Sequence, residues 1–262
     1  MTHSHRAGTL THYDEVSLYE VAFRARKFDV DFFLRRAKEL EVNAPILEFG
    51  AGAGRVTIPL AKAGHEVFAV DFSTPMLDRL KQHLARTTGA VQARVFPVHG
   101  DMRKLRIKRQ FPLVLATFNV VGHLETFLDM GAFLRTAKHH LAPGGRLIFD
   151  VPIPHPDEVE ADPEELHRVP RFKHPDTKQW VHQTERFEYD PSRQVLLVES
   201  EFRVAGMPDA LIVPLTLRQW FPKEVEAILH YEGFTQVETF ADYSDQPGVT
   251  AKDTLIFSAA LD

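Results

Sequence analysis

The stretch of sequence that decides the fold is ILEFGAGAGR, residues 46–55. Its apolar start predicts a buried strand, and its three glycines predict a tight loop that opens a helix. A dinucleotide-binding loop needs glycine at positions 50, 52 and 55, but here position 55 is Arg55 and the third glycine is Gly54. Glu48 stands just before the loop. Its carboxylate would repel a pyrophosphate and could attract a cationic group, so the loop argues against a dinucleotide ligand.

Strands and helices alternate outward from this loop. Apolar runs predict strands over 46–49, 66–71, 93–98, 113–118 and 146–151, and helical patterns occupy 55–63, 73–86 and 125–140. Such alternation indicates a parallel sheet with helices on both faces, and right-handed crossovers make that sheet doubly wound. A helix over 222–232 and strands over 234–240 and 254–260 complete a predicted α/β fold with a mostly parallel, seven-stranded sheet.

The alternation stops after the fifth predicted strand. Residues 152–178 predict a long loop with a short acidic helix, and extended runs follow at 180–189, 194–204 and 210–220. We expect these runs to form an antiparallel β insertion. At the other end of the chain, apolar residues at helical spacing predict one or two helices within residues 13–40.

Two more acids stand at the ends of predicted strands. Asp71 ends the second strand and Asp101 follows the third, at the edge where open α/β sheets bind ligands. Asp71 could accept both hydroxyls of a ribose. Asp101 could accept the exocyclic amine of an adenine, with Met102 and Met76 against the ring. Together the loop and the acids predict a ligand with an amine or sulfonium, a ribose and an adenine, but no phosphates.

With these motifs in this order, the chain resembles the class I S-adenosylmethionine-dependent methyltransferases. The matching stretches are Ile46–Gly54, Val70–Leu77, His99–Met102, Phe111–Leu124 and Leu141–Asp150. The resemblance implies a Rossmann-like methyltransferase fold, an enzyme of EC 2.1.1 type and the cofactor S-adenosyl-L-methionine, with S-adenosyl-L-homocysteine as product. The cofactor-binding residues that it implies are Glu48, Gly50, Ala51, Gly52, Gly54, Arg55, Asp71, Phe72, Met76, Asp101, Met102, Thr117 and Phe118.

In that family the methyl acceptor lies beside the end of the fourth strand, here ATFNVVGHL at residues 116–124. His123 could take a proton from the acceptor, because an unperturbed imidazole has a pKa near 6.5; packing against the following helix is the alternative. Asn119 could orient the acceptor. Methyltransferases of nucleic-acid bases carry prolines or a Pro-Cys pair in this region, whereas residues 117–124 contain no proline and the chain contains no cysteine. These absences favour a small-molecule acceptor, methylated on N or O.

The resemblance is strongest to the glycine, sarcosine and aminosugar N-methyltransferases. It divides the chain into an N-terminal helical lid over 1–43, a cofactor-binding domain over 44–152 and 219–262, and an inserted substrate-recognition β subdomain over 153–218. Candidate substrate-binding residues are Tyr13, Tyr19, Phe23, His155, Trp180, Arg218 and Trp220. Plain helix packing is the alternative for the first three, and an ordinary sheet with a solvated face is the alternative for the others.

The composition sets outer limits on function. Residues 1–150 carry 21 Lys and Arg against 15 Asp and Glu, whereas residues 151–262 carry 10 against 21, which argues against a uniformly basic nucleic-acid binder. We expect the basic cluster Arg103, Lys104, Arg106, Lys108 and Arg109 to be a solvated loop. No metal is required, and cysteine is absent. No secretory signal or apolar run of about 18–20 residues is visible, so a cytoplasmic monomer or homodimer without membrane contact is expected.

Three alternatives stay open at this point. The same transfer could act on RNA or on a protein or peptide side chain, for which the basic cluster is the one support. The protein could bind S-adenosylmethionine without transferring its methyl group, as a sensor or scaffold. A nicotinamide dehydrogenase is the third alternative, and both Arg55 and Glu48 count against it.

Overall fold

The computed structural model describes residues 16, 18, 20, 27–39, 44–174, 177–206 and 208–262. The chain divides into two compact units. The larger consists of Lys27–Ile153 and Trp220–Asp262, and the smaller contains Pro154–Gln219. The predicted lid residues Tyr13, Tyr19 and Phe23 lie outside the described residues.

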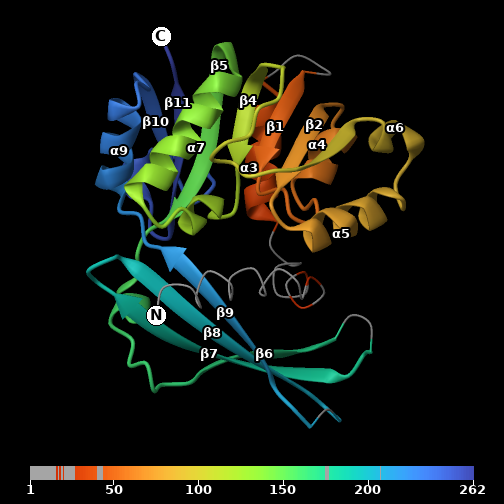
Figure 1. Ribbon diagram of the computed structural model, residues 1–262, viewed down its shortest axis with the longest axis vertical. Coiled ribbons are helices and arrows are strands. Elements are labelled where there is room, and N and C mark those ends of the chain that lie inside the picture. The colour runs from red at the N-terminus through yellow and green to blue at the C-terminus, as the bar shows by residue number, and fades with distance from the viewer. Residues whose placement is uncertain are drawn as a thin grey trace. The chain divides into compact units, whose positions relative to one another are not determined.

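The larger unit is built on a seven-stranded sheet with the order β10-β11-β5-β4-β1-β2-β3 (Figure 1). Its strands are β1 (Pro45–Phe49), β2 (Glu66–Asp71), β3 (Val95–His99), β4 (Phe111–Ala116), β5 (Leu141–Pro152), β10 (Gln236–Ala241) and β11 (Thr254–Ala260). The first five pair in parallel, and β11 runs antiparallel to both β5 and β10. The predicted mostly parallel, doubly wound sheet is confirmed.

Helices cover both faces of this sheet. They are α3 (Phe28–Ala37), α4 (Thr57–Lys62), α5 (Thr74–Leu84), α6 (Gly89–Gln92), α7 (Phe127–His140) and α9 (Pro222–Tyr231), with short 3-10 turns η1 (Val120–His123) and η2 (Gly248–Thr250). One apolar cluster joins α7 and α9 to the sheet, and a second joins α3, α4 and α5 to it. Figure 1 shows α7 and α9 together in front of the strands.

Side-chain caps set where two of these helices begin. The Ser73 hydroxyl accepts from the Met76 N–H at 3.3 Å before α5, and the Thr126 hydroxyl accepts from the Asp129 N–H at 3.0 Å before α7. Such caps satisfy N–H groups that have no partner inside the helix. Both helices therefore start just beyond the carboxyl edge of the parallel strands, where the acids stand.

The smaller unit contains a four-stranded antiparallel sheet in the order β6-β7-β8-β9 and one short helix. Its elements are α8 (Pro156–Val159), β6 (His167–Lys173), β7 (Trp180–Asp190), β8 (Val195–Val204) and β9 (Leu211–Arg218). The predicted antiparallel insertion is confirmed, but β6 was expected to be loop. It is an edge strand, and its pairing with β7 shifts register between Val169 and Phe172. Pro170 lies in that irregularity, where a strand tolerates proline.

Candidate functional site

The glycine loop follows β1 at the carboxyl edge of the sheet. Gly50, Gly52 and Gly54 have φ angles of +67°, +53° and +90°, which glycine adopts without a steric penalty. A Cβ at Gly50 or Gly54 would lie 2.3 Å from a side-chain atom of Val120 or Leu80, whereas a Cβ at Gly52 would stand 4.0 Å from its nearest neighbour. Gly50 and Gly54 therefore allow close packing, and Gly52 leaves room for a ligand. Ala51, between them, donates its N–H to the Val70 carbonyl at 3.0 Å.

Asp71 ties this loop to the end of β2. Its Oδ2 accepts from the Gly52 N–H at 2.7 Å, and its Oδ1 accepts from the Ser73 N–H at 2.8 Å. Burial raises the pKa of the Asp71 carboxyl, while these backbone hydrogen bonds act in the opposite direction. A carboxylate offers about four acceptor positions. Asp71 thus keeps capacity for ligand hydroxyls beside the open face of Gly52.

Glu48 lies under the loop and is only 1% exposed. Its Oε2 accepts from the Thr57 hydroxyl at 2.6 Å. Burial raises the pKa of Glu48 to about 7, although the Thr57 hydrogen bond and the positive charge of Arg55 favour the ionised form. A carboxyl that titrates near neutrality can hold a proton or stabilise a nearby cation. This behaviour suits a ligand with a positive group and does not suit a pyrophosphate.

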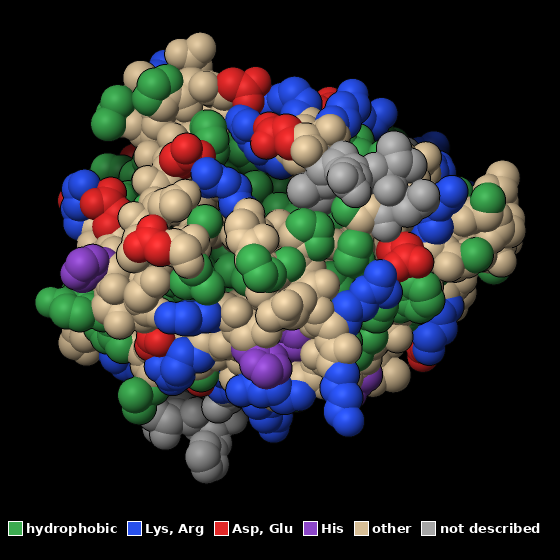
Figure 2. Space-filling view, turned by 90° about the horizontal axis from the view of Figure 1, so that it is seen from above, with side chains coloured by type: hydrophobic (Ala, Val, Ile, Leu, Met, Phe, Trp, Pro, Cys, Tyr) green, Lys and Arg blue, Asp and Glu red, His purple; other side chains and the backbone are tan. Residues whose placement is uncertain are grey.

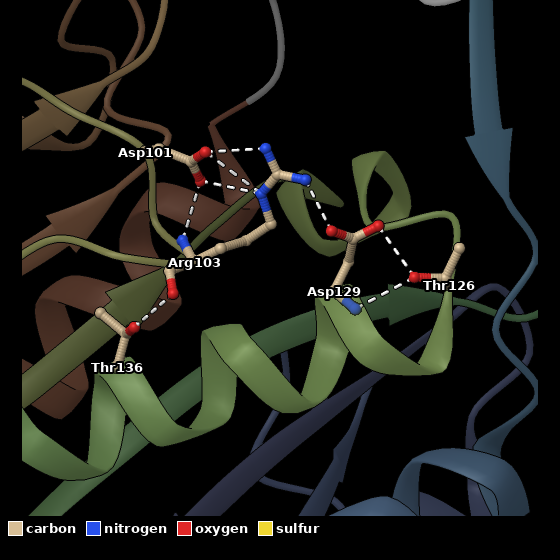
Figure 3. Close-up of polar contacts among 5 residues, drawn as sticks. All are labelled: Asp101, Arg103, Thr126, Asp129 and Thr136. Atoms are coloured by element: carbon tan, nitrogen blue, oxygen red, sulfur yellow. Dashed lines mark hydrogen bonds and ion pairs between the residues drawn. The ribbon is translucent and has the colours of Figure 1, made fainter.

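Asp101 belongs to a polar network that connects the loop after β3 to α7 (Figure 3). Its Oδ2 accepts from Arg103 Nη2 at 2.7 Å, and its Oδ1 accepts from the Arg103 N–H at 2.9 Å and from Nε at 3.0 Å. The same guanidinium reaches Asp129 Oδ1 at 2.6 Å through Nη1. Thr126 donates to Asp129 at 2.9 Å, and Thr136 donates to the Arg103 carbonyl at 2.8 Å. Arg103 therefore bridges two carboxylates.

This bridge changes two expectations. Arg103 was assigned to a solvated basic loop, but its side chain is only 29% exposed and lies between carboxylates. Asp101 was expected to accept a hydrogen bond from a ligand amine, but Arg103 already donates to both of its oxygens. The hydrogen bonds from Arg103 also hold the pKa of Asp101 below its ordinary value. A ligand amine could use only the acceptor positions that remain. Within the same cluster, Arg109 pairs with Glu66 at 2.7 Å. In Figure 2 the Lys and Arg side chains of one face form several separate groups.

The apolar residues expected around a ligand ring differ in exposure. Met102 is partly buried and packs against the core of the larger unit. Met76 is only 1% exposed, and its Sδ is the atom nearest to a Cβ built at Gly52, at 4.0 Å. Phe72 is 54% exposed and stacks on the His99 ring with 5.9 Å between centroids. Met102 and Phe72 are thus the accessible apolar candidates, and Met76 is not.

The loop after β4 has an unusual backbone. Phe118 and Asn119 have φ angles of +64° and +53°, a conformation that costs a residue other than glycine roughly 1–3 kcal/mol. The Asp150 carboxylate accepts from the Phe118 N–H at 2.6 Å and from the Asn119 N–H at 2.7 Å. Tyr243 donates its hydroxyl to the same carboxylate at 2.9 Å. The preceding Thr117 is buried at 4% exposure. A buried acid thus holds the segment where the acceptor was predicted.

Arg55 joins three segments. Its guanidinium carbon lies 4.7 Å from the centroid of the Phe118 ring. Its Nη1 and Nη2 reach the two oxygens of Asp29 at 2.8 and 2.7 Å, and the Asp29 side chain is fully buried in α3. This two-point pairing fixes the plane of the guanidinium. Arg55 therefore connects the end of the glycine loop to α3 and to the loop after β4.

His123 ends the η1 turn and is half-buried. Trp220, predicted to cover the acceptor, is 1% exposed and donates its Nε1–H to the Val121 carbonyl of this turn at 3.2 Å. Its ring also packs edge-on against Phe127 with 5.5 Å between centroids. Trp220 is therefore a packing residue that holds η1, since its ring has no open face.

Three candidate substrate residues of the smaller unit are described, and they differ in exposure and in partners. Arg218 is 5% exposed and donates to the carbonyls of Gln194 and Gln219, so it stabilises its own sheet and is not available to an acidic ligand. His155 is an exposed cap of α8 that accepts from the Asp157 N–H. Trp180 is 39% exposed, and Arg171 lies over its ring at 4.4 Å.

Sequence reasoning missed four residues that shape the site. Asp150 lies two residues before Pro152, the last residue of β5. A search for acids near the carboxyl ends of strands, which identified three carboxylates, could therefore have identified a fourth. Arg103 directly follows the Asp101-Met102 motif. Asp29 and Tyr243 carry no local signal, because they meet the site only through long-range contacts.

Residues 46–145 match the model of a family described as a methyltransferase domain. Among curated proteins, the chain is 36% identical over 106 residues to the cypemycin N-terminal methyltransferase of a Streptomyces species, which is 40% of either protein. The chain spans less than half the length of the first curated relatives it matches.

Solved structures match over nearly the whole chain. The CcbJ methyltransferase of Streptomyces caelestis is 25% identical, with a TM-score of 0.74 over 90% of this chain and 89% of that one. The glycopeptide N-methyltransferase MtfA, solved in complex with S-adenosylmethionine, is 22% identical, with a TM-score of 0.57 over 87% and 86%. The fold is thus the Rossmann-like methyltransferase fold.

Separately, the described residues include no helix of the length and apolar character that a membrane span requires.

Proposed function

We propose that the chain transfers a methyl group from S-adenosylmethionine to a nitrogen or oxygen atom of a small-molecule acceptor, and the match of residues 46–145 to the model of a methyltransferase domain supports this. The observation that carries the proposal is the pairing of Gly52 with Asp71. The glycine leaves space above the loop, and the carboxylate that fixes it keeps acceptor positions beside that space. A ribose next to a positively charged group matches this donor and acceptor set.

The residues present fit S-adenosylmethionine better than a phosphate-bearing cofactor. Glu48 and Asp71 place two carboxyls at the glycine loop, and Glu48 titrates near pH 7 because of its burial. Phosphates would meet repulsion from both. In the proposed arrangement Asp71 holds the ribose, and Asp101 with Met102 faces the adenine. Arg55 is engaged with Asp29 and orders the loop.

S-adenosylmethionine held at this site would supply an electrophilic methyl group, which would pass to the acceptor lone pair as the carbon–sulfur bond breaks and S-adenosylhomocysteine leaves. The contribution of the chain is to hold the nucleophile in line with that bond. Such positioning can lower a barrier by about 7–11 kcal/mol. Asn119 stands at the end of β4, where it could orient the acceptor.

We propose that the His123 imidazole accepts the proton that the acceptor atom loses. An aliphatic hydroxyl needs a base, whereas a neutral amine needs little help, so the role of His123 depends on the acceptor atom. Replacement of His123 with Asn should lower the transfer rate by about 10²- to 10⁴-fold if the imidazole accepts the proton. A rate close to that of the unmodified protein would give His123 a packing role in η1.

Calorimetry with S-adenosylmethionine and S-adenosylhomocysteine tests the binding half of the proposal. We expect both to bind, and Asp71→Ala to weaken binding by a few kcal/mol at most. Asp78→Ala is the matched control, since Asp78 is an exposed carboxylate of α5 that pairs with Lys81. If neither compound gives a measurable heat of binding, the proposal is wrong. A screen of cell metabolites for the mass gain of one methyl group then identifies the acceptor. Binding without turnover in that screen would favour a sensor or scaffold.

A further inference from the structure

The backbone of Phe118 and Asn119 is held against its own preference. Both residues lie in the left-handed region, with φ of +64° and +53°, although neither is glycine. Side chains at such positions are strained, and strain of this kind persists only where surrounding contacts over-determine it. The Asp150 carboxylate makes two such contacts, one with each backbone N–H.

The Asp150 carboxylate accepts hydrogen bonds from both backbone N–H groups of this segment. It is 1% exposed and lies in β5, two residues before the strand ends at Pro152. Its Oδ1 accepts from the Phe118 N–H at 2.6 Å, and its Oδ2 accepts from the Asn119 N–H at 2.7 Å and from the Tyr243 hydroxyl at 2.9 Å. Two successive N–H groups can point at one carboxylate because the left-handed backbone turns around it. Loss of the Asp150 charge would weaken both hydrogen bonds and let the backbone at 118–119 relax.

The carboxylate is itself anchored through Tyr243. The Tyr243 ring packs edge-on against Phe28 and Phe33 of α3, with centroids 5.5 and 6.1 Å apart. Its carbonyl accepts from Arg35 Nη2 at 3.1 Å. The position of Asp150 is therefore set jointly by β5 and by the packing of α3.

The same segment touches the glycine loop. Val120 follows Asn119, and a Cβ at Gly50 would lie 2.3 Å from the Val120 Cγ2 atom. Gly122 also packs against the Asn119 side chain, since a Cβ there would stand 2.8 Å from Oδ1. A shift of the backbone at 118–119 would therefore move both the Asn119 side chain and the contact with Gly50.

We propose that Asp150 is a positioning residue of the transfer reaction. Its buried carboxylate fixes the left-handed backbone of Phe118 and Asn119. That backbone in turn sets where the two side chains lie relative to the methyl group to be transferred. Tyr243 makes that placement depend on α3. The inference rests on the proposed function for its effect on transfer, but the backbone contact is independent of it.

The test compares Asp150→Asn with Asp190→Asn. Asp190 is the matched control, because its carboxylate also accepts two backbone N–H groups, in the turn between β7 and β8. In Asp150→Asn we expect hydrogen exchange of the Phe118 and Asn119 amides to accelerate by about tenfold or more, with the 50–54 loop changed less than about twofold. Asp190→Asn should leave both segments unchanged. Unaltered exchange at 118–119 in Asp150→Asn would overturn the inference.

The second measurement separates positioning from general loosening. With the acceptor found by the metabolite screen, kcat of Asp150→Asn should fall by about tenfold or more, while the Kd for S-adenosylhomocysteine changes by less than about threefold. Equal losses in both, or a kcat within about twofold of the unmodified protein, would overturn the positioning role. If the unmodified protein does not bind S-adenosylhomocysteine, the proposed function fails, and the exchange measurement still decides whether Asp150 holds the backbone.

Tyr243→Phe covers the case in which Asp150→Asn does not fold. It removes one hydrogen bond to the carboxylate and keeps the aromatic packing on α3. We expect a kcat loss and an exchange acceleration of about threefold each. No change in either measurement for Tyr243→Phe, together with an unfolded Asp150→Asn, would leave Asp150 as a core residue only and would overturn the inference.

Discussion

Glu48 makes the stability of the ligand-free protein depend on pH in an unusual direction. It is 1% exposed, and burial raises its pKa from 4.5 to about 7. Below pH 4.5 the carboxyl is neutral in both the folded and the unfolded chain, so its stabilising contribution is fully present there. Between pH 4.5 and about 7 the unfolded chain ionises this carboxyl freely, whereas the folded protein keeps the buried group protonated. This contribution to stability is therefore lost progressively as the pH rises to about 7, and no more is lost above that pH.

The size of the effect follows from the two pKa values. A tenfold difference in proton affinity corresponds to about 1.4 kcal/mol, so the change from 4.5 to about 7 corresponds to about 3 kcal/mol. Glu48→Gln keeps the shape of the side chain and cannot ionise. We expect the free energy of unfolding of Glu48→Gln, relative to the unmodified protein, to increase by about 3 kcal/mol between pH 4.5 and pH 8. In a thermal scan this is roughly 6–12 °C.

Urea denaturation at a series of pH values, without added ligand, measures this difference. Asp78→Asn is the control, because it removes the same charge from an exposed carboxylate of α5, and its difference from the unmodified protein should stay nearly constant. A Glu48→Gln difference that varies by less than about 0.5 kcal/mol over this pH range would refute the reasoning. Glu48 would then be ionised in the folded protein at neutral pH.

Two further predictions concern the ion pairs of the site. Arg103→Met removes the bridge between Asp101 and Asp129, and we expect the free energy of unfolding in urea to fall by about 1.5–3 kcal/mol; an unchanged value would show that the bridge contributes nothing to the fold. Arg55→Met leaves the buried Asp29 carboxylate without its guanidinium partner, and should cost about 3–5 kcal/mol. Lys81→Met, at an exposed pair, should cost less than about 1 kcal/mol, and similar losses in these two variants would contradict the argument.

Local sequence was sufficient for the parallel sheet and for the outline of the ligand edge. Alternating apolar runs and helical patterns predicted the strands and helices and their succession along the chain, because each run is long enough to bury one element regardless of distant residues. The glycines at 50, 52 and 54 and the acids at 48, 71 and 101 were visible because strand ends in such sheets meet at one edge. The edge strand β6 was not visible, since it is charged and interrupted by Pro170.

Whether a side chain is buried or already paired depended on contacts between residues that are distant in sequence. Nothing local to Asp101 shows that Arg103 is held in place by Asp129, on the far side of β4 in the sequence. Nothing local to Trp220 shows that it donates to Val121, 99 residues away. Nothing local to Arg218, a candidate substrate residue, shows that its side chain is only 5% exposed in the packed sheet.

The order of the residues along the chain determines which groups reach the carboxyl edge of the sheet, because strand and helix formation are governed by neighbours in sequence. The tertiary structure alone decides which of those groups remain free to bind. Burial and pairing energies depend on what packs from elsewhere in the chain, as Tyr243 and α3 do around Asp150, and no local pattern encodes them.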